Sequence, residues 1–308
     1  MKRSNWLEYV VLAEDAGMTV ERIAREKLAV SGRMLQRLTR SKGILLNRKT
    51  PFLQKTVKAG DRVSVRVADQ ANERMVEAVA YDPSFQPEIL FQDEHFLIVN
   101  KPAGLMVHPT AQGQTGTLLQ LLAAWLAHRG ESAAIHAVHR LDKETTGTIL
   151  FAKSGYAHQL ADRMLREGAV KREYLAVLSG QLTEEKGTIT AAIGRDPYHQ
   201  TRRRVTAQED AAITHYEAIA RSERYTLARI WLETGRTHQI RVHFQHLGYP
   251  LAGDRLYGGS TIDFSRQALH AYRLTVPQLV AGTEIEVTAK LPEDLNQLVL
   301  AQFALTLE

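Results

Sequence analysis

The chain has 308 residues, 44% hydrophobic and 24% charged, which is enough to bury the core of one large domain and one small domain. It contains no cysteine, and this excludes disulfides, thiolate nucleophiles and metal sites that use sulfur. Its apolar runs are shorter than the roughly 20 residues that span a bilayer, and no apolar run near the N-terminus leads to a cleavage site. We therefore expect a cytoplasmic protein without a membrane helix.

The positive charge is concentrated near the N-terminus. The formal net charge is +5, but residues 20–49 hold nine Lys or Arg against two Glu, a net of +7, so the rest of the chain sums to −2. Such a cluster indicates contact with a phosphate backbone, although a solvated basic helix is the alternative. The candidate RNA contacts are Arg33, Arg37, Arg40 and Lys42.

Local patterns predict a compact α/β unit over residues 14–68. Apolar residues at helical spacing predict two short helices, around Val20 and around Met34, with a break at Ser31 and Gly32. The alternation from Val63 to Val67 predicts a strand.

Three segments of this unit resemble the S4-type RNA-binding domain. They are Val30-Ser-Gly-Arg-Met-Leu-Gln-Arg-Leu, Gly43-Ile-Leu-Leu-Asn and Ala59-Gly-Asp-Arg-Val. The resemblance implies that the unit binds RNA. One departure is Asn47-Arg-Lys, where that domain often has Asn-Gly-Lys.

Residues 69–87 carry mixed charges and two prolines with little periodicity, which is typical of a linker. Residues 88–308 form the predicted second domain, where short strand-like runs outnumber helical stretches. Their irregular alternation predicts an α+β fold, a mixed, largely antiparallel sheet with flanking helices. The helices are expected at 117–128, 156–166 and 237–247.

The segment His139-Arg-Leu-Asp-Lys-Glu-Thr-Thr-Gly is the most informative for chemistry. Asp142 is flanked by the cations Arg140 and Lys143, which favour an ionised and therefore nucleophilic carboxylate. The alternative is that Asp142 caps a turn or pairs with Arg140.

This segment resembles the signature of the RluA family of pseudouridine synthases. Further segments match in the same order: Asn100-Lys-Pro-Ala-Gly-Leu-Met-Val-His-Pro, Lys171-Arg-Glu-Tyr, Ile193-Gly-Arg-Asp-Pro, Glu233-Thr-Gly-Arg-Thr-His-Gln-Ile-Arg-Val-His, Gly253-Asp-Arg-Leu-Tyr and Leu269-His-Ala. Glu144 and Thr146 stand where aspartate and serine are usual. Both changes keep the polarity.

The resemblance implies roles for five residues. Asp142 would attack a uridine, on the sugar or on the pyrimidine ring, and Arg241 would pair with it. Tyr174 would contact the flipped uracil and help to remove its ring proton, Leu269 would line the pocket, and Arg140 would enter the RNA stack. Without the motifs, Tyr174 and Leu269 would be interpreted as packing residues and Arg241 as a surface cation.

Arg202, Arg203 and Arg204 follow a proline and a tyrosine, and we interpret them as an RNA-contacting hairpin or loop; solvated surface is the alternative. No cofactor is implied. A metal site at His238, His243 and His246 is disfavoured by their spacing. The expected partner is RNA, most often large-subunit ribosomal RNA and alternatively transfer RNA, with no obligatory protein partner. A non-catalytic RNA-binding or ribosome-assembly protein and a nucleoside hydrolase are the competing functions.

Overall fold

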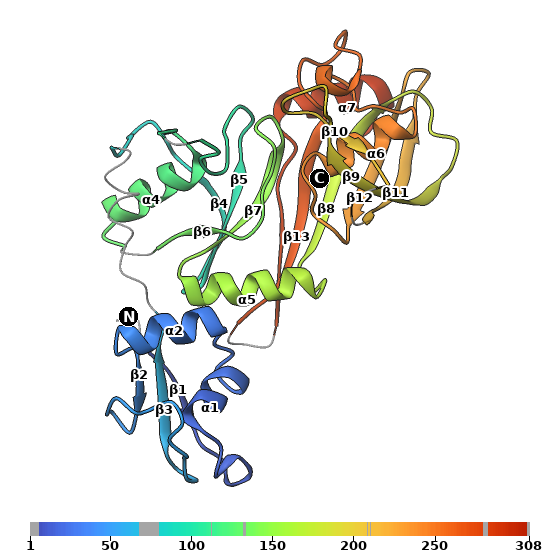
Figure 1. Cartoon of the computed structure of the whole chain (residues 1–308). Helices are drawn as coiled ribbons and strands as arrows, with labels where there is room; N and C mark the ends of the chain where they lie inside the picture. Colours follow the sequence, from blue (N-terminus) through green and yellow to red (C-terminus); the bar gives the residue numbers. More distant parts are fainter. Residues whose placement is uncertain are drawn as a thin grey trace.

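The computed structural model describes residues 6–67, 80–111, 113–131, 134–207, 209, 211–279 and 283–306. They form a small N-terminal unit and a larger unit, and helix α5 (Gly155–Arg166) runs along the junction (Figure 1). In these described ranges no helix is long and apolar enough to cross a bilayer. Much of the expected linker lies outside the described residues. Its second half lies against the larger unit, where Tyr81 stacks on His128 with ring centroids 3.8 Å apart.

The N-terminal unit is a three-stranded antiparallel sheet in the order β1-β3-β2 with helices packed on it. Both predicted helices and the predicted strand are present. The elements are β1 (Trp6–Val10), η1 (Ala13–Asp15), α1 (Val20–Glu26), α2 (Gly32–Arg40), β2 (Ile44–Leu46) and β3 (Arg62–Arg66). The sheet thus includes residues before position 14, because β1 pairs with β3 along its whole length.

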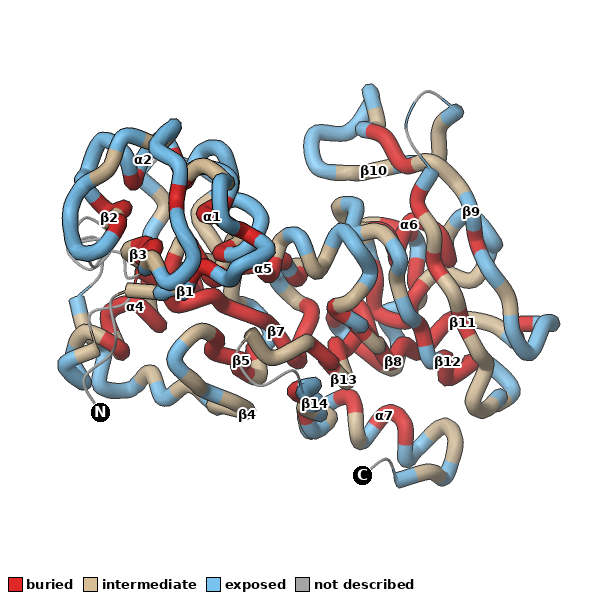
Figure 2. The backbone as a smooth tube through the Cα atoms, turned by 90° about the horizontal axis from the view of Figure 1, so that it is seen from below, coloured by how far each residue is buried: buried red, intermediate tan, exposed pale blue. Residues whose placement is uncertain are grey.

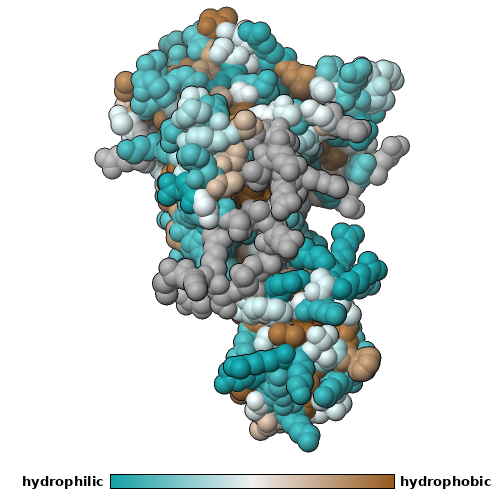
Figure 3. All heavy atoms as spheres, turned by 90° about the vertical axis from the view of Figure 1, so that its left-hand side faces the viewer, coloured by the Kyte–Doolittle hydropathy of each residue, from teal (hydrophilic) through white to brown (hydrophobic). Residues whose placement is uncertain are grey.

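Helix capping and apolar burial explain this unit. The side chains of Thr19 and Ser31 accept hydrogen bonds from the backbone N–H groups three residues later, so each begins a helix. The apolar faces of α1 and α2 then pack on β3, where Val63 and Val65 are fully buried. The arginines of α2 therefore lie on its outer side, and Figure 3 shows hydrophilic side chains over the exposed face of the unit.

The larger unit is built on an 11-stranded sheet in the order β10-β9-β11-β12-β8-β13-β7-β5-β4, with β14 paired to β13 and β6 to β7. The strands are β4 (Glu88–Gln92), β5 (Phe96–Lys101), β6 (His136–Ala137), β7 (Thr146–Ala152), β8 (Lys171–Ser179), β9 (Lys186–Arg195), β10 (Arg203–Val205), β11 (Ala211–Arg221), β12 (Tyr225–Leu232), β13 (Leu269–Pro277) and β14 (Glu284–Thr288). Among these pairings only β7 with β13 is parallel. The predicted α+β fold with a largely antiparallel sheet is confirmed.

Helices cover both faces of this sheet. They are α4 (Leu118–His128), α5, α6 (Gln239–His246), α7 (Glu293–Phe303) and the short η2 (Arg255–Tyr257). On β5, Leu97 and Val99 face the core under α4, while Phe96 and Ile98 face the core under α5. A strand covered on both faces is apolar along its length, and Figure 2 shows burial concentrated along the central strands.

The parallel pairing of β7 with β13 determines which segments lie next to Asp142. Gly147 has φ +110°, and a Cβ there would lie 2.1 Å from the carbonyl oxygen of Ala271, so only glycine fits. This close approach brings the segment before β7, which carries Asp142, next to the start of β13 at Leu269.

Candidate active site

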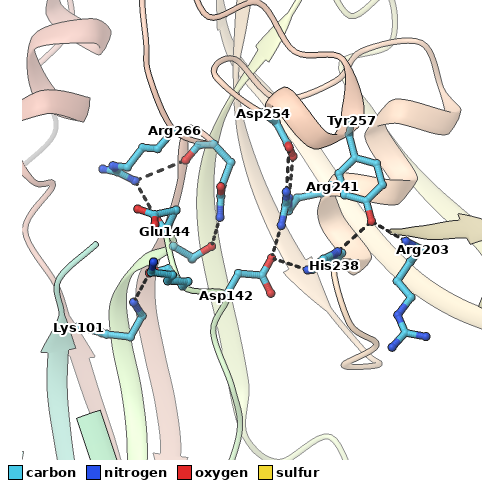
Figure 4. A network of polar contacts seen from close by, with 12 residues as sticks. Lys101, Asp142, Glu144, Arg203, His238, Arg241, Asp254, Tyr257 and Arg266 are labelled. Carbon is cyan, nitrogen blue, oxygen red and sulfur yellow. Dashed lines mark hydrogen bonds and ion pairs between the residues drawn. The ribbon is translucent and has the colours of Figure 1, made fainter. Parts of the chain in front are cut away.

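Buried cations hold the backbone of the loop that carries Asp142. Lys101 Nζ donates to the carbonyl oxygen of Lys143 at 2.9 Å, and Arg266 Nη1 donates to that of Glu144 at 2.9 Å (Figure 4). Charge-assisted hydrogen bonds of this kind are stronger than neutral ones. The loop is therefore fixed immediately after Asp142. Arg266 bonds the backbone of residue 144 and not its side chain. The glutamate that stands here in place of the usual aspartate therefore leaves this hydrogen bond unchanged.

Lys101 is fully buried and donates to three carbonyl oxygens, those of Pro102, Leu105 and Lys143, at 2.8–2.9 Å. Burial lowers the pKa of its ammonium to about 7, against the attraction of Glu144 and Asp142. Three carbonyl acceptors match the three N–H groups of an ammonium. This lysine acts as a structural anchor for the loop.

Two buried histidines support the same segment. His270 Nδ1 lies 2.8 Å from the Thr146 hydroxyl, and its Nε2 lies 3.0 Å from the carbonyl oxygen of Ala289. His139 Nε2 accepts a hydrogen bond from the N–H of Leu150 at 3.1 Å. Burial lowers the pKa of His139 to about 3 and that of His270 to about 4. Both rings are neutral near pH 7, and any hydroxyl at position 146 can serve His270, as serine also would.

Arg241 lies between two carboxylates. Its Nε and Nη2 donate to Asp254 at 2.6 and 2.8 Å, and its Nη1 donates to Asp142 Oδ2 at 2.9 Å (Figure 4). Burial opposes the charge of Arg241, but the hydrogen bonds and charges of the two aspartates outweigh it and raise its pKa. The bidentate bond to Asp254 orients the guanidinium, and the guanidinium orients Asp142.

The second oxygen of Asp142 remains available. Within the described ranges, Oδ1 takes part in no hydrogen bond, and the side chain is 17% exposed while that of Arg241 is 8% exposed. The carboxylate is thus paired on one oxygen and open on the other. This is the arrangement of an oriented nucleophile.

A second polar chain reaches Asp142 from the β9–β10 hairpin. Tyr257 accepts a hydrogen bond from the N–H of Arg203 at 2.9 Å, and its hydroxyl lies 2.9 Å from His238 Nδ1. His238 Nε2 lies 3.9 Å from Asp142 Oδ2. Burial lowers the pKa of His238, so the neutral ring faces the carboxylate.

Asp142, His238 and Arg241 line one pocket of about 560 Å³, which we call the catalytic pocket. Tyr174 on β8 and Leu269 at the start of β13 are both buried in its wall, and Arg140 is exposed beside it. Burial raises the pKa of the Tyr174 phenol, with Asp142 adding to the effect. The structure thus brings together Asp142, Arg241, Tyr174, Leu269 and Arg140.

Arg172, two residues before Tyr174, also lines the pocket. It is 8% exposed, its Nη2 donates weakly to the carbonyl oxygen of Thr234 at 3.5 Å, and its Nε has no hydrogen-bond partner. In the described part of the chain it forms no ion pair. A buried cation without a carboxylate leaves positive potential in the pocket wall, which suits a polyanionic substrate.

The remaining predicted RNA contacts lie outside the pocket. The exposed α2 arginines and Lys42 belong to the N-terminal unit. The arginine triplet lies on the β9–β10 hairpin, where Arg203 and Arg204 pair with Arg195 and Gly194. Arg204 is exposed, whereas Arg202 lies over the ring of Tyr257 at 5.5 Å.

Sequence reasoning missed Asp254, Tyr257 and Lys101 as site residues and considered His238 only as a metal ligand. All four lie inside motifs that were quoted for the family resemblance, which was the available signal. The predicted helix 237–247 is also shorter: α6 begins at Gln239, because His238 adopts a left-handed conformation with φ +59°. This turn directs the ring of His238 towards Tyr257.

Each of the three histidines considered as metal ligands lies in a different environment. His238 contacts Tyr257, and His246 is exposed. His243 is fully buried, with Nδ1 2.8 Å from the Thr214 hydroxyl and Nε2 3.0 Å from the carbonyl oxygen of Ala191. Over the ranges that the structure describes, no three His, Asp or Glu side chains converge as a metal ion would require.

Known proteins are similar to this chain in sequence and in fold. The RNA pseudouridylate synthase family model matches residues 95–246. The chain is 38% identical to the uncharacterized RNA pseudouridine synthase YhcT of Bacillus subtilis, over 98% of this chain and 99% of the relative. It is 35% identical to ribosomal large subunit pseudouridine synthase D of Nitrosomonas europaea, over 97% and 89%.

Among solved structures, human RNA pseudouridylate synthase domain containing 1 matches with a TM-score of 0.55 and 25% identity, over 71% of this chain and 96% of that one. The family resemblance stated from the motifs is confirmed. Since the sequence similarity extends over nearly the whole length of the relatives, the chain belongs to the RNA pseudouridine synthase family of isomerases.

Proposed function

We propose that this protein converts uridines of ribosomal RNA to pseudouridine with Asp142 as the nucleophile. The observation that carries the proposal is the carboxylate of Asp142, held through Oδ2 by Arg241 and open at Oδ1 in the catalytic pocket. Orientation by a buried, bidentate-bound arginine directs the carboxylate at a reacting carbon.

The reaction needs only groups of the chain and the substrate. Asp142 forms a covalent bond to the uridine, and the bond between ribose C1′ and base N1 breaks. The uracil turns and its C5 bonds to C1′, the bond to Asp142 breaks, the C5 proton leaves by way of Tyr174, and N1 takes up a proton in its place. Atoms are conserved and no electron acceptor is required, in keeping with an isomerisation without a cofactor. The same balance holds whether Asp142 first attacks the sugar or the pyrimidine ring.

The other pocket residues have complementary roles in the proposal. Tyr174 stacks against the extruded uracil, and its hydroxyl relays the ring proton; because burial raises its pKa, the phenol is protonated before substrate binds. Leu269 forms the apolar wall under the base. Arg140, exposed at the pocket, enters the gap that the uridine leaves in the stack.

Large-subunit ribosomal RNA is the favoured substrate, because a relative similar over most of both chains is named for the ribosomal large subunit. The N-terminal unit acts as an S4-like RNA-binding module through its exposed arginines. Asp142, Arg241, Tyr174 and Leu269 line a pocket formed within one chain, so the proposed site needs no residue of a partner subunit. A monomeric cytoplasmic enzyme is part of the proposal.

The test compares wild type with Asp142→Asn on unmodified ribosomal and transfer RNA, with pseudouridines mapped by chemical adducts and reverse-transcription stops. Asp263→Asn is the matched control, since Asp263 lies on another part of the larger unit and pairs with Arg224. We expect stops in large-subunit RNA with wild type and the control, and none with Asp142→Asn.

Other outcomes overturn parts of the proposal. Stops in transfer RNA alone would reject ribosomal RNA as the substrate. Equal modification by Asp142→Asn would remove Asp142 from the mechanism. If no variant modified RNA but all bound it, the non-catalytic RNA-binding alternative would replace the enzyme.

A further inference from the structure

A basic groove lies between the N-terminal unit and helix α5 of the larger unit. This α2–α5 groove has a volume of about 810 Å³. Five arginines line it from both units, against one aspartate, Asp162, among its described lining residues: Arg25, Arg33, Arg37, Arg163 and Arg166. The groove therefore has a net charge of +4 from these side chains. The family resemblance drew attention only to the side formed by α2.

Helix α5 is shared between the cores of the two units. Its Ala157 and Ala161 pack on the large sheet, whereas Tyr156 and Leu160 pack on the apolar core of the N-terminal unit. All four side chains are buried, with exposed fractions of 7% or less. The N-terminal unit is thus packed on α5 through a continuous apolar contact.

Hydrogen bonds fix the same junction. Tyr156 donates its hydroxyl to the carbonyl oxygen of Leu28 at 2.9 Å. Gln159 donates to the carbonyl oxygen of Ala29 at 2.5 Å and accepts from the N–H of Ser31 at 3.0 Å. These contacts hold the first turn of α2 beside α5. The arginines of the two helices consequently face one groove in a defined arrangement.

The groove joins the catalytic pocket at Arg166, which lines both. On another side, Arg236 and Thr237 line both the catalytic pocket and a hollow of about 620 Å³ beneath the β9–β10 hairpin. This hairpin hollow also contains Arg195, Arg203 and Arg204. Basic surface is therefore adjacent to the catalytic pocket on two sides.

We infer that α5 supplies Arg163 and Arg166 to a continuous RNA path, which runs from the α2–α5 groove past the catalytic pocket to the hairpin hollow. The partner is a structured RNA whose phosphates the arginines neutralise on both sides of the extruded uridine. The inference rests on the proposed function for the identity of the RNA, while the path itself is defined by charge and adjacency.

Binding on both sides of the pocket has an energetic purpose. Extruding a base costs a few kcal/mol of stacking and pairing, which phosphate contacts elsewhere must offset. Because the N-terminal unit is packed on α5, contacts in the groove also set the direction in which the RNA enters the pocket. Arg163 and Arg166 are therefore positioning residues rather than catalytic residues.

The experiment measures the affinity of full-length protein for an unmodified large-subunit ribosomal RNA transcript over about 50–200 mM salt. The test variant carries Arg163→Ala and Arg166→Ala. Its matched control carries Lys186→Ala and Arg229→Ala, which removes the same charge from two exposed strand positions. Each of these is paired with a glutamate, as Arg166 is paired with Asp162. A third variant, Asp162→Asn, removes the negative charge from the groove.

For the double α5 variant, we expect the slope of log affinity against log salt to fall by about 1.8, because each duplex phosphate contact contributes roughly 0.9. KM should rise while kcat stays within about twofold, since no group in contact with the reacting atoms changes. Asp162→Asn should bind more tightly than wild type. The control should match wild type in slope and in KM.

An unchanged slope in the α5 variant, or an equal loss in the control, would overturn the inference. Thermal melting of all variants verifies folding, and both α5 arginines are exposed. The experiment distinguishes a failure of RNA binding through α5 from a failure of RNA modification. If wild type modifies RNA while the α5 variant binds normally, only the path is wrong; if wild type binds through α5 but modifies nothing, only the proposed function is wrong.

Discussion

The catalytic pocket and the α2–α5 groove use arginine in two physically different ways. In the pocket, Arg241 is 8% exposed at its side chain and gives three hydrogen bonds to two carboxylates. In the groove, Arg163 and Arg166 are exposed, and among the residues that the structure describes Arg166 pairs only with Asp162 on its own helix. Arg241 acts by orienting the carboxylate of Asp142, whereas Arg163 and Arg166 act through their positive charge.

The difference follows from the surrounding dielectric. A buried pair interacts at short range and is little affected by salt, but it must be fully hydrogen-bonded to offset the cost of desolvation. Exposed charges act over a screening length of about 8 Å at physiological salt and tolerate varied geometry. Substitution should therefore affect kcat in the pocket, and affinity and salt dependence in the groove.

The largest effect should come from Arg241→Lys. Lysine keeps the charge but cannot bond Asp254 in a bidentate manner and reach Asp142 as well. Disrupting such a buried pair costs about 3–5 kcal/mol, which corresponds to a fall in kcat of roughly 10²–10⁴-fold. Steady-state kinetics on the RNA transcript measure it.

Arg224→Lys is the matched control, because Arg224 pairs with Asp263 at 2.8 Å near the surface. It should leave kcat unchanged. If Arg241→Lys raised KM and spared kcat, Arg241 would act as a charge, as the groove arginines do, and the comparison would fail.

Asp254→Asn should have the next largest effect. The variant keeps the shape of Asp254 but loses its charge and one of two acceptors for Arg241. Charged hydrogen bonds contribute about 1.5–3 kcal/mol, so kcat should fall about 10–100-fold while RNA affinity is retained. Asp263→Asn should show no fall. Normal kcat in Asp254→Asn would mean that Asp142 alone orients Arg241.

Acid should affect the pocket through its buried histidines. The pKa of His139 is about 3 and that of His270 about 4, both below the unfolded value of about 6.5. From pH 6.5 down towards 4 the unfolded chain binds more protons than the folded chain. The free energy of unfolding should therefore decrease as pH falls, by up to about 1.4 kcal/mol per pH unit for each histidine.

Urea unfolding at several pH values measures this slope. His270→Gln should reduce it by about one proton, and the same substitution at exposed His246 is the matched control. A slope that does not change in His270→Gln would contradict the assignment of a buried neutral ring.

The smallest effect should come from Arg33→Ala combined with Arg37→Ala. Both side chains line the groove, so loss of two phosphate contacts should weaken RNA binding by about tenfold or less and reduce the salt slope by about 1.8, with kcat unchanged. Arg62→Ala with Arg22→Ala, at exposed ion-paired positions of the same unit, is the control. Equal losses in both pairs would mean that the whole unit acts as a diffuse charge.

Much of the site could be expected from the motifs. Each motif is a short run of neighbouring residues, and both the runs and their order along the chain are visible in the sequence. Asp142, Tyr174 and Arg241 lie in separate runs, and the structure places them around one pocket. Asp254 also lies in a quoted motif, but its role could not be derived from the motif, because it depends on a bond to Arg241 that no local pattern encodes. His238 was placed in a helix because apolar spacing carries no signal for a left-handed turn.

By itself the sequence determined the family, the α+β class, the two capped helices of the N-terminal unit and the segment that concentrates the positive charge. These depend on runs of neighbouring residues, whose periodicity and caps act through the local backbone. Tertiary structure alone decided that Arg241 connects Asp142 with Asp254 and that α5 belongs to two cores. Such contacts join residues up to 130 positions apart, as Gln159 and Ala29 are, and arise only when sheets and helices pack in one register.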